Sequence, residues 1–256
     1  MDYERTKLRN YEEFVFNNIL KNISFYDLLT NSSLLDDVAI CDSLGVRAYT
    51  EYNRSFETDI DFLISGYNSR DDLCLFLVNE FNPDKYDKKI YANKAFLRLY
   101  YSVPYEQEFG NEFIIDFHVG GYFHKNALLV EAYKGFYEGT RWMDVNSIGG
   151  LETINLPIPS PEELFIFKLL KYLGRDDVDL ISLLLSGSVD LRKAENKIKK
   201  YRNIKKRMIA NFDALSHSFD KVVSRWKVYY QTTESEDNIE TVKKELNEMR
   251  SRAFAR

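Results

Sequence analysis

Two aspartates, Asp59 and Asp61, lie two residues apart in the run 58–64, which is otherwise largely apolar and typical of a β-strand. Successive side chains of a strand point to opposite faces, so both carboxylates share one face, about 6.5–7 Å apart along the strand. Aspartate is depleted in strands, and two like charges on one face repel each other. Mg²⁺ prefers carboxylate oxygens and relieves that repulsion when it binds between them. The pair therefore predicts a metal site on one face of a sheet.

A third acid, Asp116, lies in a second apolar run, residues 113–117. Transfer of a nucleotidyl group by two metal ions requires a third carboxylate near the first two, to hold the ion that activates the attacking hydroxyl. If the strand of Asp116 neighbours the strand of the aspartate pair, the three carboxylates converge. Taken alone, Asp116 is explained equally well as an edge-strand acid that faces water.

A glycine turn precedes the aspartate pair. Residues 45–48 read Gly-Val-Arg-Ala and follow a short apolar run, residues 38–41, that is typical of a buried strand. The backbone N–H groups of such a turn, and of the short helix expected after it, favour phosphate. The turn, the Thr-Asp-Ile-Asp sequence of residues 58–61 and the later aspartate resemble the signature of the nucleotidyltransferase superfamily, which has the polymerase-β-like fold. That family usually has Ser or Gly at the second turn position, where this chain has Val46.

This resemblance implies a magnesium-dependent transfer of a nucleoside monophosphate from a nucleoside triphosphate to a hydroxyl, with release of pyrophosphate. Two Mg²⁺ ions would be held by three catalytic carboxylates, those of Asp59, Asp61 and Asp116. The triphosphate would be received by the turn residues Gly45, Val46 and Arg47. For Arg47, an ion pair with Glu51 one helical turn further on is an equal alternative.

A later segment, from Ser160 through Lys168 to Asp179, is similar to the helical segment of the abortive-infection AbiEii-type toxin branch of this superfamily. The resemblance implies that Lys168 neutralises the leaving pyrophosphate, and that Asp176 or Asp179 positions Lys168 or the base. It also makes the protein a candidate toxin that pairs with a protein antitoxin. For Lys168, the alternative is a side chain that extends from a buried helix to water. For Asp176 and Asp179, the alternative is that they stabilise the N-terminus of a helix, and this interpretation is preferred for Asp177.

A basic run lies near residues 190–207 of a chain whose net charge is −5. Overall acidity argues against a general nucleic-acid coat protein, but a local cluster of this kind makes the phosphate contacts that bind RNA. An RNA or tRNA 3′ end is therefore a candidate acceptor, and the residues expected to contact RNA are Lys197, Lys200, Lys205 and Lys206. The alternative is the solvated face of an amphipathic helix, because an apolar stripe runs along the same segment.

The periodicity of the sequence predicts a mixed core of strands and helices followed by a helical region, and the resemblance implies an α+β fold of the nucleotidyltransferase type. We expect N-terminal helices over 4–29, a helix over 71–81, and strands over 38–41, 95–103, 112–119 and 153–158. Ser160 and Pro161 begin a helix that is apolar on nearly every face, and the chain after it is helical. The expected organisation is an N-terminal helical extension at 1–35, a mixed α/β core at 36–158 and a helical domain at 159–256.

The remaining composition limits where the protein works and how it could bind metal. The chain has 256 residues and no apolar run long enough to span a membrane. Cys41 and Cys74 lie in apolar surroundings without metal-type spacing, which indicates buried, reduced thiols and a cytoplasmic protein. His118 and His124 are expected to be structural or surface residues. The rival function is a non-catalytic member of the fold that binds RNA or protein, and Val46 favours it.

Overall fold

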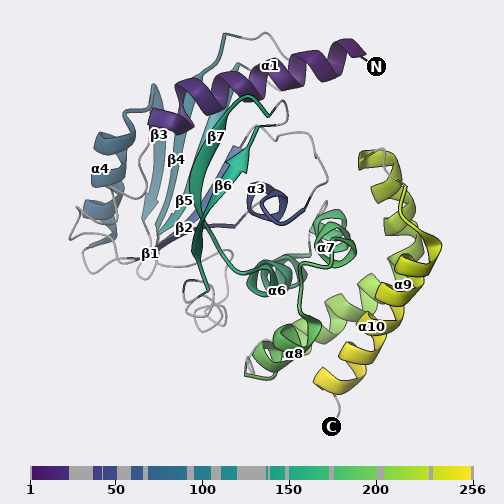
Figure 1. Ribbon diagram of the computed structural model, residues 1–256. Coiled ribbons are helices and arrows are strands. Elements are labelled where there is room, and N and C mark those ends of the chain that lie inside the picture. Colours follow the sequence, from purple (N-terminus) through teal and green to yellow (C-terminus); the bar gives the residue numbers. More distant parts are fainter. Residues whose placement is uncertain are drawn as a thin grey trace.

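The structure is a computed structural model that describes residues 2–22, 37–41, 43–50, 59–65, 69–90, 95–104, 111–119, 137, 139–147, 150–172, 176–200, 205–230 and 233–254. This part of the chain is a mixed α+β protein in which a sheet lies beside a layer of helices (Figure 1). The predicted class, a mixed sheet with an N-terminal helix and a C-terminal helical region, is confirmed. Among the described residues, no helix is long and apolar enough to cross a membrane.

The main sheet has five strands in the spatial order β1-β2-β5-β4-β3. β2 and β5 run parallel, and all other neighbours are antiparallel. The strands are β1 (Asp37–Ile40), β2 (Asp59–Ser65), β3 (Lys85–Ile90), β4 (Ala95–Ser102) and β5 (Glu112–Val119). The strands expected from the apolar runs are thus confirmed, and those of the two aspartate motifs are neighbours.

One face of this sheet is apolar and is covered by α4 (Arg70–Phe81), the helix expected over 71–81. Ser69 begins α4 because its hydroxyl accepts a hydrogen bond from the backbone N–H of Asp72. The ring of Phe81 packs edge-on against Phe117 at 4.9 Å, and Phe117 stacks on Phe62 at 5.4 Å. Since these rings fill the face under α4, the polar residues of the same strands project from the opposite face.

Both cysteines lie in this interior. Cys41 and Cys74 are buried free thiols, as predicted. Burial, only partly opposed by the charge of Lys88, raises the pKa of Cys74 to about 11. The thiol therefore stays protonated at neutral pH and is a packing residue, not a nucleophile.

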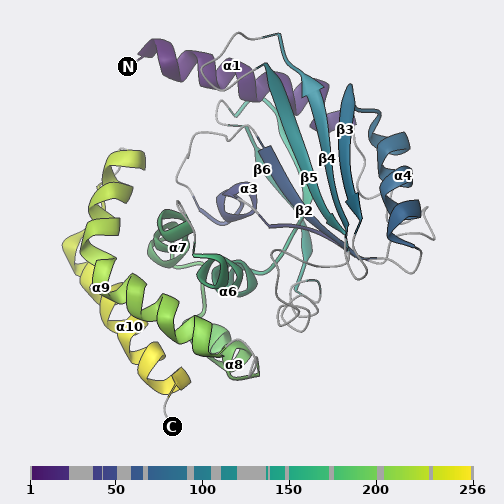
Figure 2. The ribbon, with the colours of Figure 1, turned by 180° about the vertical axis from the view of Figure 1, so that it is seen from behind.

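A second, two-stranded sheet and the N-terminal helix complete this half of the molecule. The strands β6 (Arg141–Asn146) and β7 (Thr153–Ile158) form a hairpin, and β7 packs against β1. Helix α1 (Asp2–Asn18), followed by the short helix η1 (Leu20–Asn22), runs across one end of the sheet in Figures 1 and 2. The Ser147 hydroxyl donates to Glu13 Oε1 at 2.6 Å and ties the hairpin to α1. Residues 23–29, the rest of the predicted helical stretch, lie outside the described residues.

After residue 160 the described chain is helical: α6 (Pro161–Lys171), α7 (Asp176–Leu185), α8 (Leu191–Lys200), α9 (Lys205–Tyr230) and α10 (Glu236–Phe254). Ser160 accepts a hydrogen bond from the N–H of Glu163, and Pro161 occupies the first turn, so the predicted cap is confirmed. α6 is buried from Glu162 to Leu170, as an all-round apolar helix should be. In both views α4 and the pair α9–α10 lie on opposite sides of the molecule (Figures 1 and 2).

The structure departs from the sequence prediction in three elements. β3 and β6 were not expected, because their sequences, Lys-Tyr-Asp-Lys-Lys-Ile and Arg-Trp-Met-Asp-Val-Asn, lack an alternating apolar pattern. The prediction of a turn at Gly45 is wrong, because Gly45 lies inside helix α3 (Ser43–Arg47). The boundaries of the expected domains remain a prediction.

Candidate active site

A row of charged side chains crosses the polar face of the main sheet. Strand register places Asp61 of β2 opposite Asp116 of β5. The same row continues to Arg98 of β4 and then to Asp87 of β3. Residues paired in register on neighbouring strands lie on the same face, so four strands each contribute one charge to this row. The pairing of β2 with β5 therefore brings Asp61 and Asp116 together, as the sequence predicts.

Asp116 is held by Arg98 through two hydrogen bonds. Arg98 Nε donates to Asp116 Oδ1 at 2.7 Å, and Nη2 donates to Oδ2 at 2.6 Å. The Asp116 side chain is only 5% exposed, whereas that of Arg98 is 36% exposed. Burial and the nearby charge of Asp61 raise the pKa of Asp116 despite the opposing effect of Arg98. The alternative in which Asp116 faces water at a sheet edge is thus wrong, since β5 lies between β2 and β4.

Asp61 lies beside His118 on the same face. His118 Nε2 is 3.4 Å from Asp61 Oδ1, and the His118 ring packs against Phe96 with ring centroids 5.3 Å apart. Burial acts to raise the pKa of Asp61, but the hydrogen bond and charge of His118 and the charges of Lys171 and Lys168 outweigh it, so the pKa is lowered. Asp61 is therefore ionised at neutral pH and lies within the electrostatic reach of α6.

Asp59 completes the predicted trio at the start of β2. It is partly exposed and lies two residues before Asp61 on the same face, opposite Ile114 of β5. Its charge acts on the hydroxyl of Tyr11, since it is among the causes that raise the pKa of Tyr11 after burial itself. α1 therefore passes close to this end of the aspartate pair.

The three carboxylates have the right chemistry for Mg²⁺ but not the arrangement. Both oxygens of Asp116 accept hydrogen bonds from Arg98. Among the residues the structure describes, no group of three or more His, Cys, Asp and Glu side chains is placed to hold a metal ion. The site as it stands does not fit the two-metal cage expected of Asp59, Asp61 and Asp116, and Arg98 is the reason.

Lys168 forms a buried cluster with the two acids that the sequence associated with it. Its Nζ lies 2.7 Å from Asp179 Oδ2 and 3.2 Å from Asp176 Oδ1, and all three side chains are at most 6% exposed. Asp176 begins α7, with Asp177 and Asp179 in the same first turn, so the helix N-terminus reading is confirmed. The reading in which Lys168 reaches water is wrong, and the cluster joins α6 to α7.

The residues expected to receive the triphosphate lie in packed surroundings. A Cβ on Gly45 would lie 2.7 Å from Ile40 Cγ2, so the glycine lets α3 approach β1 closely. Val46 is 2% exposed. Arg47 Nη1 is 2.5 Å from Glu12 Oε1 of α1, and Nη2 donates to the carbonyl of Asn146. Glu51, the alternative partner of Arg47, lies outside the described residues, and the binding of a triphosphate here remains a prediction.

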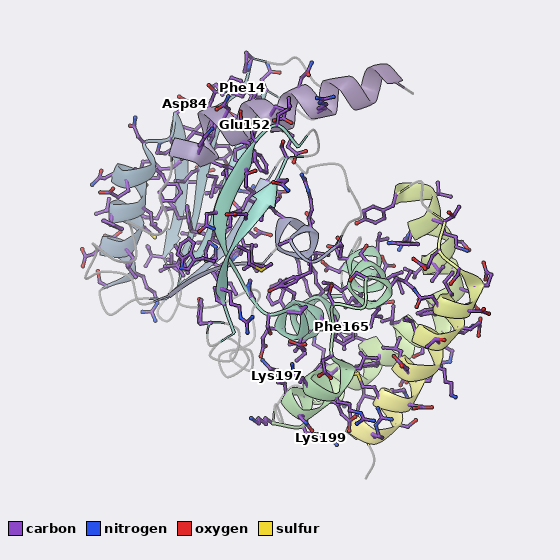
Figure 3. The ribbon with its side chains drawn as sticks, in the orientation of Figure 1. Phe14, Asp84, Glu152, Phe165, Lys197 and Lys199 are labelled. Carbon is purple, nitrogen blue, oxygen red and sulfur yellow. The ribbon has the colours of Figure 1, made fainter. Side chains whose placement is uncertain are left out.

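The basic run lies on α8 and the start of α9. Ala194, Ile198 and Met208 of its apolar stripe are buried, as an amphipathic helix requires. Lys197 pairs with Glu163 of α6. Lys200 and Lys206 are exposed, and Lys205 is the first residue of α9. Figure 3 labels Lys197 and Lys199 on α8, at the end of the molecule opposite α1. RNA binding by this run remains a prediction.

Two residues of the site were missed from the sequence: Arg98 and His118. Arg98 is a lone basic residue in the apolar run of β4, the same kind of signal that identified Asp116, and could have been found in that way. His118 was expected to be structural or on the surface. Its position two residues after Asp116 in β5 places it on the same face, so strand alternation alone predicts it to be a neighbour of the acids.

No family model matches the chain, and no curated protein matches it. One solved structure, described as the crystal structure of an antigenic nucleotidyltransferase-like protein from Paracoccidioides brasiliensis, is similar at a TM-score of 0.42 and 15% sequence identity. The match covers 79% of this chain and 92% of that chain. A likeness at this level carries no argument about function, and none of these findings bears on the AbiEii-type toxin branch.

Proposed function

We propose that the protein is a Mg²⁺-dependent nucleotidyltransferase that moves a nucleoside monophosphate from a nucleoside triphosphate to a hydroxyl. One observation carries the proposal: the parallel pairing of β2 with β5 puts Asp61 and Asp116 in register on one face. Asp59 follows on the same face, and the charges of Lys168 and Lys171 reach Asp61 from α6. Carboxylates gathered on a sheet face within electrostatic reach of two lysines form the kind of surface that binds a metal-chelated triphosphate.

In the proposed reaction, the acceptor oxygen forms a bond to the α-phosphorus while the bond to the bridging oxygen breaks and pyrophosphate leaves. The hydroxyl proton passes to solvent or to a carboxylate of the site. Asp61, which is ionised, would bind and orient the reacting groups together with Asp59. Mg²⁺, when bound, would supply charge neutralisation at the phosphates, whereas both oxygens of Asp116 accept hydrogen bonds from Arg98.

The acceptor we propose is an RNA 3′ end, with a tRNA as the first candidate. Exposed lysines on α8 and α9 support it, because side chains such as Lys200 and Lys206 can contact a phosphate backbone. Lys197 supports it less, since its ammonium group already pairs with Glu163. A role as the toxin of a pair with a protein antitoxin rests on the sequence resemblance alone, and a place in the cytoplasm rests on the two buried free thiols.

The test is to incubate the protein with each α-labelled nucleoside triphosphate, Mg²⁺, and total cellular RNA and protein. Label transferred to a macromolecule, and lost in Asp61→Asn, would support the proposal and name both substrates. The matched control is Asp144→Asn, which removes an exposed aspartate on β6, outside the site. Transfer that persists in Asp61→Asn would contradict the site assignment.

A non-catalytic module that binds RNA or protein is the second candidate. The bidentate pair of Arg98 with Asp116 favours it, as do the packed positions of Gly45, Val46 and Arg47. Thermal unfolding with each triphosphate, with and without Mg²⁺, separates the two. A metal-dependent rise in melting temperature that Asp61→Asn abolishes supports the enzyme, and no shift with any nucleotide supports the module.

A further inference from the structure

One edge of the main sheet is open. β3 is the last strand of the sheet and pairs with β4 on one side, and no other described strand pairs with its second side. The opposite edge strand, β1, is packed against β7. In β3 every residue except Lys88 is exposed, and the strand lies with α4 at the outer margin of the sheet (Figure 2). Such an edge presents backbone N–H and C=O groups to which another strand can pair.

Apolar side chains gather at this edge. Tyr86 and Ile90 of β3 are 45% and 46% exposed, and Leu75 of α4 is 43% exposed. Tyr86 and Ile90 flank Lys88 on one face of the strand, and Lys88 Nζ donates to Asp71 of α4, so this is the face that α4 covers. Leu75 follows Asp71 by one helical turn and lies on the same side of α4. We call Leu75, Tyr86 and Ile90 the edge patch, because exposed apolar side chains at an unpaired edge mark a contact with another protein.

The sequence of β3, Lys-Tyr-Asp-Lys-Lys-Ile, is complementary to itself in one antiparallel register. When two copies pair about a two-fold axis at Lys88, Tyr86 of one lies opposite Ile90 of the other. In the same register, Asp87 lies opposite Lys89. Each of these pairs occurs twice because of the symmetry, and residues directly opposite on neighbouring strands contact each other. The two Lys88 side chains that meet on the axis each already pair with Asp71.

Other registers lack this match. Centring the axis on Asp87 would place two Asp87 side chains opposite each other, Tyr86 opposite Lys88, and Lys85 opposite Lys89. A shift by a single residue would turn the apolar and charged faces of the two strands to opposite sides. Lysines on an edge strand normally discourage pairing with other chains. In β3 they select one partner and one register.

We propose that a second copy of this chain pairs antiparallel along β3 and joins the two five-stranded sheets into one continuous sheet. The edge patches of the two copies then cover each other beside the two α4 helices. On the polar face, the charged row that ends at Asp87 continues to Lys89 of the second copy. This inference goes beyond the proposed function and holds for the enzyme and for the non-catalytic module alike.

Sedimentation equilibrium over a range of concentrations tests the pairing. The mass of the wild type should rise from 30.2 kDa towards twice that value as the concentration increases. Ile90→Lys, at an exposed position, should raise the dissociation constant about tenfold or more, because a charge replaces an apolar contact twice in the interface. The matched control is Val228→Lys on α9, which replaces a 78% exposed apolar residue on the other side of the molecule and should change nothing.

A charge exchange tests the register itself. Asp87→Lys places like charges opposite Lys89, and Lys89→Asp places like charges opposite Asp87, so each variant alone should associate about tenfold more weakly than the wild type. An equimolar mixture of the two variants should recover the dimer, because each strand then meets opposite charges on the other.

Three results would overturn the pairing: a wild type that stays monomeric at about 0.1 mM, a dimer that Ile90→Lys leaves unchanged, and a mixture that associates no better than either variant alone. None of them bears on nucleotidyl transfer, which the labelled triphosphates test separately.

Discussion

One cluster on the sheet and one between α6 and α7 each place a cation near two carboxylates, and the two clusters differ in their access to water. On the sheet, Arg98 pairs with Asp116, and Asp61 lies beside it in the register. Between α6 and α7, Lys168 pairs with both Asp176 and Asp179. Arg98 is 36% exposed, whereas Lys168 is 4% exposed and its two partners are 6% and 1% exposed.

Burial decides what each cluster can do. A sealed ion cluster cannot exchange its partners, since each charge would have to enter the apolar interior alone. An ion pair with one exposed member can exchange, because water solvates the departing group. The difference assigns the helix cluster to joining α6 and α7, and it leaves the sheet cluster in contact with water, although both carry residues that the sequence singled out for function.

The largest loss of stability is expected in the buried cluster of Lys168 with Asp176 and Asp179. Lys168→Met leaves two carboxylates buried without their cation, and this should lower the free energy of unfolding by about 3–5 kcal/mol. Urea unfolding followed by tryptophan fluorescence measures it, since Trp226 is buried against Ser182 of α7. Lys193→Met, on an exposed lysine of α8, is the control and should change stability by about 0.5 kcal/mol or less.

The triple variant Lys168→Met, Asp176→Asn, Asp179→Asn tests whether stability returns when all three charges of the cluster are removed. Because the charges are removed together, no group is left uncompensated, and most of the lost stability should return. If Lys168→Met lowered the free energy of unfolding no more than Lys193→Met does, the cluster would be accessible to water. The two clusters would then not differ in the way proposed.

Much of the fold could be predicted because its central strands and α6 are apolar runs with few alternatives. Ser160 and Pro161 define the start of α6 by chemistry that is local in the sequence. β3 escaped prediction because it is an edge strand, exposed at most of its positions, with no periodic apolar face. The prediction of a turn at Gly45 was wrong because a glycine marks either a turn or a close approach of two segments. The position of the Ile40 side chain against Gly45 shows that here it marks a close approach.

The sequence prediction named the acidic side chains of the charged row on the sheet but not Arg98 and His118 beside them. Asp59, Asp61 and Asp116 are conspicuous because each interrupts an apolar strand. Which residue faces them depends on strand order and register, which are not local properties of the sequence. Arg98 was therefore missed although its strand was predicted, and the pairing of Lys168 with Asp176 and Asp179 was associated correctly but read as reaching the substrate.

A smaller loss of stability is expected on the sheet. Arg98→Gln removes two charge-assisted hydrogen bonds, but solvent screening at a 36% exposed side chain reduces their contribution. The free energy of unfolding should fall by about 1 kcal/mol, measured by the same urea titration. A loss as large as that of Lys168→Met would mean that Arg98 is part of a rigid brace, and the exposed member would not be free to move.

The smallest effect on stability is expected for Asp61→Asn, and it appears only in how the free energy of unfolding depends on pH. The pKa of Asp61 is lowered in the folded protein, with burial opposed by His118, Lys171 and Lys168, so the ionised carboxylate stabilises the fold. Relative to Asp61→Asn, this stabilisation should be complete above about pH 4, where the unfolded chain is also ionised. It should then decrease as the pH falls through the lowered pKa of the folded state. Urea titrations from neutral to acidic pH measure the difference, with Asp144→Asn as the control; a difference that grows on acidification would show that Asp61 is held by burial and not by its cations.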